Sequence, residues 1–193
     1  MSKRLGRAGF AALVVAGGVL VAPATASAAP KACALGTWKV SKHTFTLTGD
    51  GLKMTGSGGK GTKLTISAKS LKYDFSKSTK VVGKGTGPGG EDLGSWGKYT
   101  KTMTVGGAFK GKKSGTFALR PKTAKGSAVV RGGDAGSSTP TETYNLAKSL
   151  RAGNLEPIIP FSGKFTCGKK SLHQWYKYTG DGGTIKVDVW FKR

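Results

Sequence analysis

The residue types that carry out most enzyme chemistry are scarce in this chain of 193 residues, which has two histidines, two cysteines and nine acidic residues. A Ser-His-acid triad would need His43 or His173 beside an activated serine, yet no Gly-x-Ser-x-Gly motif occurs. Of the few carboxylates that glycoside hydrolysis would need as a pair, Glu91 and Asp92 lie in a glycine-rich stretch. The sequence therefore predicts a protein that is not an enzyme, with no catalytic residue.

Metal and cofactor sites are not expected either. A four-ligand zinc site would have to combine both cysteines with both histidines from distant positions, without the usual Cys-x-x-Cys spacing. The stretch Gly83 to Gly87 lacks the Gly-Lys-Ser/Thr ending and the following helix of a phosphate-binding loop. We therefore predict no metal and no cofactor.

The most suggestive binding residues are aromatic and basic, and they lie near the C-terminus. On a β-strand His173, Trp175 and Lys177 share one face, because side chains alternate between the two faces of a strand. Trp190 and Lys186 occupy outward positions on the following strand. These residues predict an exposed aromatic platform for sugar rings or stacked bases, and the alternative is that the rings cover one another.

The N-terminal residues follow the order of a secretory signal peptide. Three basic residues precede the apolar run 10–21, and small residues occupy 24–29. An apolar run of about twelve residues is shorter than the ~20 that span a bilayer, so no transmembrane anchor is expected. We predict a cleaved signal peptide over 1–29 and one secreted, extracellular domain over 30–193.

The two cysteines of an exported chain predict one disulfide, because the compartment is oxidising and no other ligand competes for them. Cys33 and Cys167 would close a loop of well over a hundred residues. Such a cross-link stabilises a fold by roughly 4 to 5 kcal/mol in the chain-entropy treatment.

The charge of the chain is strongly unbalanced. It has 32 lysines and arginines against nine acidic residues, a net charge of +23 at neutral pH, and only three of the cations fall in the signal region. This excess predicts attraction to polyanions such as anionic cell-wall polymers, acidic polysaccharide or extracellular nucleic acid, weakened by salt. The alternative is that the charge serves solubility alone.

Short alternating runs bounded by glycine recur along the mature chain and predict an all-β domain. The last run alternates most clearly, with apolar residues that should face the core at Ile185, Val187, Val189 and Phe191. The expected strands are 37–48, 52–57, 61–68, 70–76, 78–84, 98–106, 114–120, 126–131, 141–147, 162–167, 170–178 and 183–192.

Three stretches do not fit this pattern. Gly83 to Gly97 holds seven glycines and is predicted to be a flexible loop. Gly132 to Thr139 is also expected to be irregular. Around Leu146 to Leu150 there is room for one short helical turn before the prolines Pro157 and Pro160 force an extended crossing.

The segment Cys33-Ala34-Leu35-Gly36-Thr37-Trp38 resembles the Gly-x-Trp motif that opens the first strand in the lipocalin and fatty-acid-binding superfamily. There the Trp closes one end of an antiparallel β-barrel, and a basic residue of the last strand packs across its ring. The resemblance implies that Trp38 and Arg193 close a barrel here through a cation–π contact.

The two-cysteine frame and the basic last strand also make the chain similar to a group of small exported actinobacterial lipocalin-like proteins. The resemblance covers both ends of the chain, and the middle only by its strand content. It implies a single-domain, lipocalin-like antiparallel β-barrel with at most one short helix.

We therefore expect a secreted, monomeric, non-enzymatic binding protein. Its ligand is either a small apolar molecule inside the barrel or a cell-surface acidic polymer outside it. The candidate interior ligand residues are Leu64, Tyr73, Tyr176 and Phe191. The alternatives are an extracellular adhesion module that binds polyanions through its basic surface, and an enzyme inhibitor that acts through the glycine-rich loop.

Overall fold

The computed structural model describes residues 32–180 and 182–193, so the predicted signal peptide lies outside the described residues. The described chain is built from β-strands and one short helix, which confirms the all-β prediction. In chain order the elements are β1 (Gly36–Gly49), β2 (Leu52–Ser57), β3 (Lys63–Ile66), β4 (Ser70–Asp74), β5 (Val81–Thr86), β6 (Asp92–Thr100), β7 (Thr102–Lys110), β8 (Ser114–Gly126), β9 (Val129–Asp134), β10 (Glu142–Asn145), α1 (Leu146–Ala152), β11 (Ser162–Cys167), β12 (Ser171–Gly180) and β13 (Gly183–Lys192).

The long strand β1 pairs with three other strands. Along one edge it pairs with β13. Along its other edge its first residues, from Gly36 to Lys39, pair with β3, whereas the later residues, from Thr44 to Gly49, pair with β2. The sheet therefore forks at β1.

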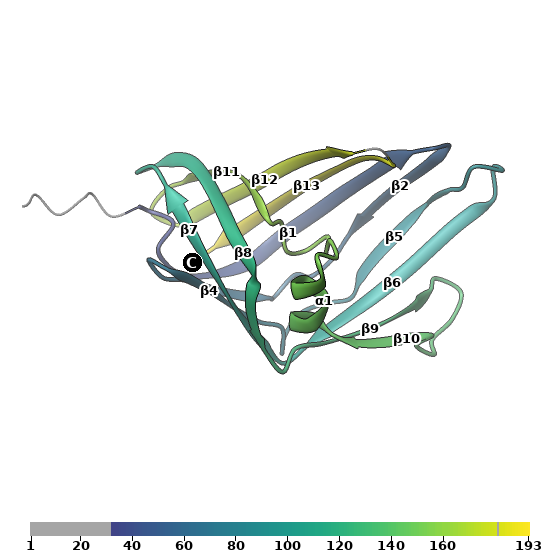
Figure 1. The fold of residues 1–193 in the computed structure, drawn as a ribbon, viewed down its shortest axis with the longest axis horizontal. Helices are drawn as coiled ribbons and strands as arrows, with labels where there is room; N and C mark the ends of the chain where they lie inside the picture. Colours follow the sequence, from purple (N-terminus) through teal and green to yellow (C-terminus); the bar gives the residue numbers. More distant parts are fainter. Residues whose placement is uncertain (1–31, 181) are drawn as a thin grey trace, which may run out of the picture.

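One arm of the fork closes into a barrel. The eight antiparallel strands β1, β13, β12, β11, β8, β7, β4 and β3 follow one another around it, and β3 returns to β1. The other arm, which we call the branch sheet, consists of β2, β5, β6, β9 and β10. In Figure 1 the barrel occupies the left-hand side, and the strands of the branch sheet run out to the right.

The chain crosses from the branch sheet into the barrel between β2 and β3. Gly58 and Gly61 have φ angles of 137° and 92°, which L-residues with a side chain rarely adopt. A Cβ atom on Gly58 would also lie 2.1 Å from the backbone oxygen of Lys80. The crossing stays attached to β1, because Val40 donates a backbone hydrogen bond to Thr62 at 2.8 Å and accepts one from Gly61 at 3.0 Å.

Large apolar side chains fill the barrel core. The predicted inward residues of the last strand, Ile185, Val187, Val189 and Phe191, are all buried. Many of the largest fully buried apolar side chains come from the barrel strands β1, β3, β4, β7, β11 and β12 and the residues next to them, and include Trp38, Phe75, Met103, Phe165 and Leu172. Leu146 and Leu150 of α1 and Ile159 are also fully buried. Barrels of about eight strands are narrow enough for such side chains to fill them.

The prediction of a flexible loop over Gly83 to Gly97 is wrong. Most of these residues belong to β5 and β6, which pair with each other, and only the connection 87–91 lies outside them. The glycines fit because β5 lies very close to β2: a Cβ atom on Gly85 would be 1.9 Å from the backbone oxygen of Lys53. Glycine here permits close strand packing rather than disorder.

Several boundaries also differ from the prediction; β8, for example, runs to Gly126 where the expected strand ends at 120. The expected strand 98–106 is two strands, because Lys101 adopts a φ of 62° and turns the chain from β6 in the branch sheet to β7 in the barrel. The expected irregular stretch from Gly132 begins later, since β9 runs to Asp134. A strand can end at one residue with an unusual backbone conformation, and the pattern of apolar residues does not indicate where that happens.

The predicted helical turn is confirmed as α1, which follows a side-chain cap and ends at a glycine. The Asn145 side chain accepts a hydrogen bond from the Lys148 amide at 2.9 Å, and Gly153 closes the helix with a φ of 95°. The helix packs on β8 and β10 with Leu146, Ala147 and Leu150 buried. Within 32–180 and 182–193, no helix is long and apolar enough to cross a membrane.

Candidate functional site

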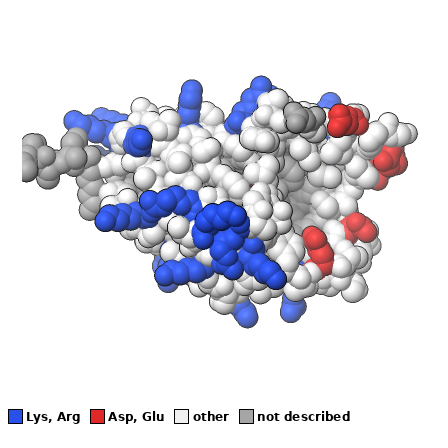
Figure 2. Space-filling model, in the orientation of Figure 1, with Lys and Arg blue, Asp and Glu red and all other residues white. Residues whose placement is uncertain are grey.

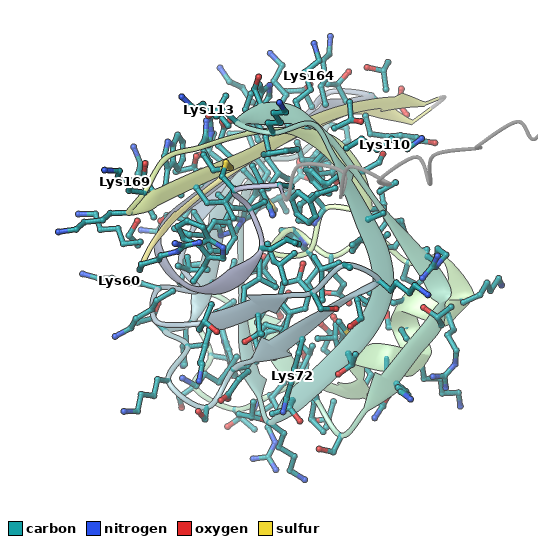
Figure 3. The ribbon with its side chains drawn as sticks, turned by 90° about the vertical axis from the view of Figure 1, so that its left-hand side faces the viewer. Lys60, Lys72, Lys110, Lys113, Lys164 and Lys169 are labelled. Atoms are coloured by element: carbon teal, nitrogen blue, oxygen red, sulfur yellow. A yellow bond between two sulfur atoms is a disulfide. The ribbon has the colours of Figure 1, made fainter. Side chains whose placement is uncertain are left out.

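The outside of the barrel is basic. Among the described residues of its eight strands the only acids are Asp74 and Asp188. We call the exposed lysines and arginines of these strands and of the turns between them the basic wall. Figure 3 views the barrel end-on, and the side chains of its labelled lysines point outward from different strands and turns: Lys60, Lys72, Lys110, Lys113, Lys164 and Lys169.

Three lysines of this wall stand side by side on neighbouring strands. Lys39 of β1 is directly opposite Lys192 of β13 on one side and Lys63 of β3 on the other. We call these three residues the lysine row. Directly opposed residues of an antiparallel pair have Cβ atoms only ~5 Å apart, and like charges in such positions repel.

A surface pocket of about 370 Å³ lies over the lysine row and is also lined by Lys77 and Arg193. Its one acidic lining residue is Asp74, which lies opposite Lys63. The Asp74 side chain accepts a hydrogen bond from the Ser76 amide at 3.0 Å, and this bond is the main reason that its pKa is lowered. One carboxylate against five cationic lining residues leaves a pocket with a clear excess of positive charge.

Beside this pocket the start of β1 and the residues before it are linked to the last residue of the chain and to β11. Arg193 Cζ lies 4.3 Å from the centre of the Trp38 ring, and Arg193 Nη2 donates to the Leu35 oxygen at 2.9 Å. The predicted disulfide is confirmed between Cys33 and Cys167, with a Cα–Cα distance of 6.0 Å. It joins the segment before β1 to the end of β11.

The structure brings the predicted aromatic and basic residues together on β12 and β13. The His173 ring stacks on Trp190 at 4.6 Å and on Trp175 at 4.8 Å between centroids, and its Nε2 lies 2.8 Å from Asp188 Oδ1. Both tryptophans are only partly exposed. The rings therefore cover one another in part, as in the alternative considered from the sequence.

Two lysines beside this aromatic stack also lie directly opposite each other. Lys177 of β12 lies directly opposite Lys186 of β13, and both side chains are exposed. The basic wall thus contains like-charge contacts at two separate places, the lysine row and this pair.

The four candidate interior residues lie in the core. Leu64, Tyr73, Tyr176 and Phe191 are between 0% and 8% exposed and belong to one continuous apolar cluster. Burial raises the pKa of Tyr176 to about 12. A ligand in contact with these side chains would have to displace packed neighbours.

A further site, which we call the cleft, was not predicted from the sequence. It is a hollow of about 420 Å³ between the branch sheet and the segment 155–157 that follows α1. Figure 2 shows a hollow with acidic residues around it at the end of the molecule away from most of the lysines. Phe45, Trp96 and Val130 form apolar parts of its wall.

Glu156 is the most buried acid of the cleft, with 3% of its surface exposed. Its Oε2 accepts hydrogen bonds from the hydroxyls of Tyr99 at 3.0 Å and Tyr144 at 3.4 Å, and its Oε1 accepts one from Ser149 at 3.2 Å. Burial raises the pKa of Glu156, and these hydrogen bonds partly oppose the rise because they favour the ionised carboxylate.

In comparisons with protein-family models, curated proteins and solved structures, nothing matched this chain. The fold alone therefore defines the structural class of this protein. It is a closed eight-stranded antiparallel barrel with a branch sheet, and the barrel is compatible with a lipocalin-like fold. The two candidate binding sites are the lysine row and the cleft.

Proposed function

We propose that this protein is a secreted, non-enzymatic, lipocalin-like protein that binds acidic cell-surface polymers on its basic wall. The observation that supports the proposal most directly is the lysine row, in which Lys192, Lys39 and Lys63 occupy directly opposed positions on three strands. The relation to small exported actinobacterial lipocalin-like proteins is part of the same proposal, since it rests on the Gly-x-Trp motif and the cysteine pair.

The physical reason is electrostatic. Opposed lysines raise the free energy of the folded protein when no anion is present, because like charges in directly opposed positions repel. Asp74, opposite Lys63, offsets part of that repulsion at one end of the row. A chain of phosphate or carboxylate groups would relieve that repulsion and fill the pocket above the row. The basic wall extends beyond this pocket over several strands (Figure 3), which suits a polymer that contacts many cations at once.

The remaining charge of the wall would draw such polymers toward the row from a distance. Long-range attraction of this kind raises association rates and falls steeply as salt increases. The aromatic stack of His173, Trp175 and Trp190 lies on the same barrel, and its partly exposed rings can contact a sugar component of the polymer.

The test is the affinity of the mature protein for an immobilised poly(glycerol phosphate) polymer over a range of salt concentrations. Replacing Lys39, Lys63 and Lys192 by glutamine should weaken binding at low salt by at least about tenfold and flatten the salt dependence. The matched control replaces three exposed lysines elsewhere, Lys53, Lys84 and Lys148, and removes the same net charge.

Equal losses in the two triple variants would show that net charge alone drives the interaction, and would overturn the lysine row as its centre. Affinity that does not change with salt would overturn binding through the basic wall altogether.

A further inference from the structure

Among the residues that the structure describes, the cleft of this cationic protein is lined by carboxylates and by no lysine or arginine. Asp134, Glu142 and Glu156 all reach it from different segments. The whole chain has 32 cationic residues against nine acids, so a lining with three acids is locally unusual. Two lysines border it: Lys80 Nζ lies 4.0 Å from the centre of the Trp96 ring, and Lys148 lines an adjoining hollow together with Glu142 and Glu156. We propose that the cleft is a separate binding site for a small organic ammonium ion with an apolar body.

The shape of the cleft follows from glycines on the branch strands. Gly83, Gly97 and Gly133 line it, where larger side chains would occupy the hollow. Gly132 makes room in the same way for an acid, since a Cβ atom there would lie 2.6 Å from Glu142 Oε1. A volume of about 420 Å³ falls within the range of pockets that hold small molecules.

The walls of the cleft suit an apolar body next to a positive charge. Phe45, Val81, Trp96 and Val130 supply apolar and aromatic surface, and Leu155 is an exposed large apolar side chain in the same lining. The Trp96 ring already interacts with one cation, since Lys80 Nζ lies 4.0 Å from its centroid. Aromatic faces attract ammonium groups through their quadrupole.

The carboxylates occupy different depths. Glu156 is held at the bottom by the hydroxyls of Tyr99, Tyr144 and Ser149, which fix its orientation before any ligand arrives. Glu142 is exposed on β10 and free to meet an incoming ammonium group. A carboxylate that is already oriented loses little conformational freedom when it binds a cation.

The proposal does not depend on polymer binding by the basic wall. The lysine row and the cleft share no lining residue. The overall positive charge of the protein repels small cations, so ammonium binding would require a local site that overcomes this repulsion.

The experiment uses three probes with the same phenylethyl body and different end groups: phenethylammonium, phenethyl alcohol and phenylpropionate. Binding to the mature protein is followed by NMR titration of the indole N–H of Trp96, a lining residue of the cleft; this N–H donates to the Ser137 oxygen. We expect the ammonium probe to cause saturable chemical-shift changes. The alcohol should bind with an affinity at least about tenfold weaker, and the carboxylate should cause no change.

Glu142→Gln should raise the dissociation constant of the ammonium probe by about tenfold, because it removes one of the two exposed carboxylates of the cleft, the other being Asp134. Glu91→Gln is the matched control, since Glu91 is an exposed acid of the β5–β6 connection that does not line the cleft. It should change affinity by less than about twofold.

Three results would overturn the proposal. The first is an alcohol that binds as tightly as the ammonium ion. The second is an equal loss of affinity in Glu142→Gln and Glu91→Gln. The third is an ammonium probe that leaves the Trp96 signal unchanged. The polymer assay on the lysine-row variant is read independently, so failure at one site is distinguishable from failure at the other.

Discussion

The barrel and the branch sheet are parts of one antiparallel sheet, yet their inward positions are filled in opposite ways. In the barrel, inward positions hold large apolar side chains such as Leu71 and Phe165, and the charge is on the outside. In the branch sheet, glycines such as Gly83 and Gly97 face the cleft, and carboxylates line the hollow they leave. One region is solid and basic on its convex surface, and the other is hollow and acidic within.

This difference separates two kinds of binding. A convex surface with cations in rows contacts an extended partner at many points, whereas a hollow that holds fixed polar groups selects a small molecule by shape and charge. Steering by overall charge attracts polyanions to the protein, but it opposes the approach of cations. The two regions should therefore respond in opposite directions to added salt: polymer binding weakens, and the overall repulsion of ammonium ions is reduced.

The largest expected effect concerns the disulfide, which cross-links the barrel. Cys33→Ser removes the closure of a loop with a sequence separation of 134 residues and should lower stability by roughly 4 to 5 kcal/mol. For a domain of this size the melting temperature would fall by on the order of 10 to 20 °C. Thermal unfolding followed by circular dichroism measures it, and an unchanged Tm would contradict the role assigned to this bond.

A smaller effect is expected at the contact between Arg193 and Trp38. Arg193→Ala loses the guanidinium over the indole and the hydrogen bond to the Leu35 oxygen, so stability should drop by about 1 to 2 kcal/mol. Urea unfolding measures the change. Lys192→Ala, at the neighbouring exposed position, is the control and should be slightly stabilising, because it relieves the repulsion with Lys39; an equal loss in both variants would mean that the contact adds nothing specific.

The smallest expected effect concerns the raised pKa of Glu156 in the cleft and its contribution to stability. Because the pKa of Glu156 is raised in the folded state, the folded protein binds a proton there more tightly than the unfolded chain does. The contribution of this group to stability is therefore present below the ordinary carboxyl pKa and is lost as pH rises through the raised folded pKa. Glu156→Gln removes this dependence.

The measurement is the difference in unfolding free energy between the wild type and Glu156→Gln, followed by urea unfolding from about pH 4 to about pH 8. The difference should move steadily in favour of the glutamine variant as pH rises. Parallel pH profiles would contradict a perturbed carboxyl. His43, whose pKa is lowered by burial, is present in both proteins and cancels in this comparison.

The strands with strict alternation could be predicted from the sequence because their signal is local. The run that ends the chain places Ile185, Val187 and Phe191 inward as expected. The same applies to the helical turn before Gly153 and to the cysteine pair. The glycine-rich end of β5 and the first six residues of β6 were missed, because glycines have no side chains that could alternate between polar and apolar. The neighbour of β5, Lys53 in β2, also lies some thirty residues away in the sequence.

The sites were harder to predict than the strands because they depend on register. Lys39, Lys63 and Lys192 form a row only when β1, β3 and β13 pair with the alignment seen here. Glu156 follows a helix in a proline-containing segment, and its partner Tyr99 is 57 residues earlier in the chain. Nothing in the local sequence distinguishes this carboxyl from a solvated one.

The position of β1 at the fork affects how its backbone exchanges hydrogen with solvent. Residues from Thr44 to Thr48 have strand neighbours on both sides, β13 in the barrel and β2 in the branch sheet. The backbone there cannot open without breaking both arms of the fork. Amide hydrogens in this part of β1 should therefore exchange only through global unfolding, and at the same slow rate as those of the barrel core.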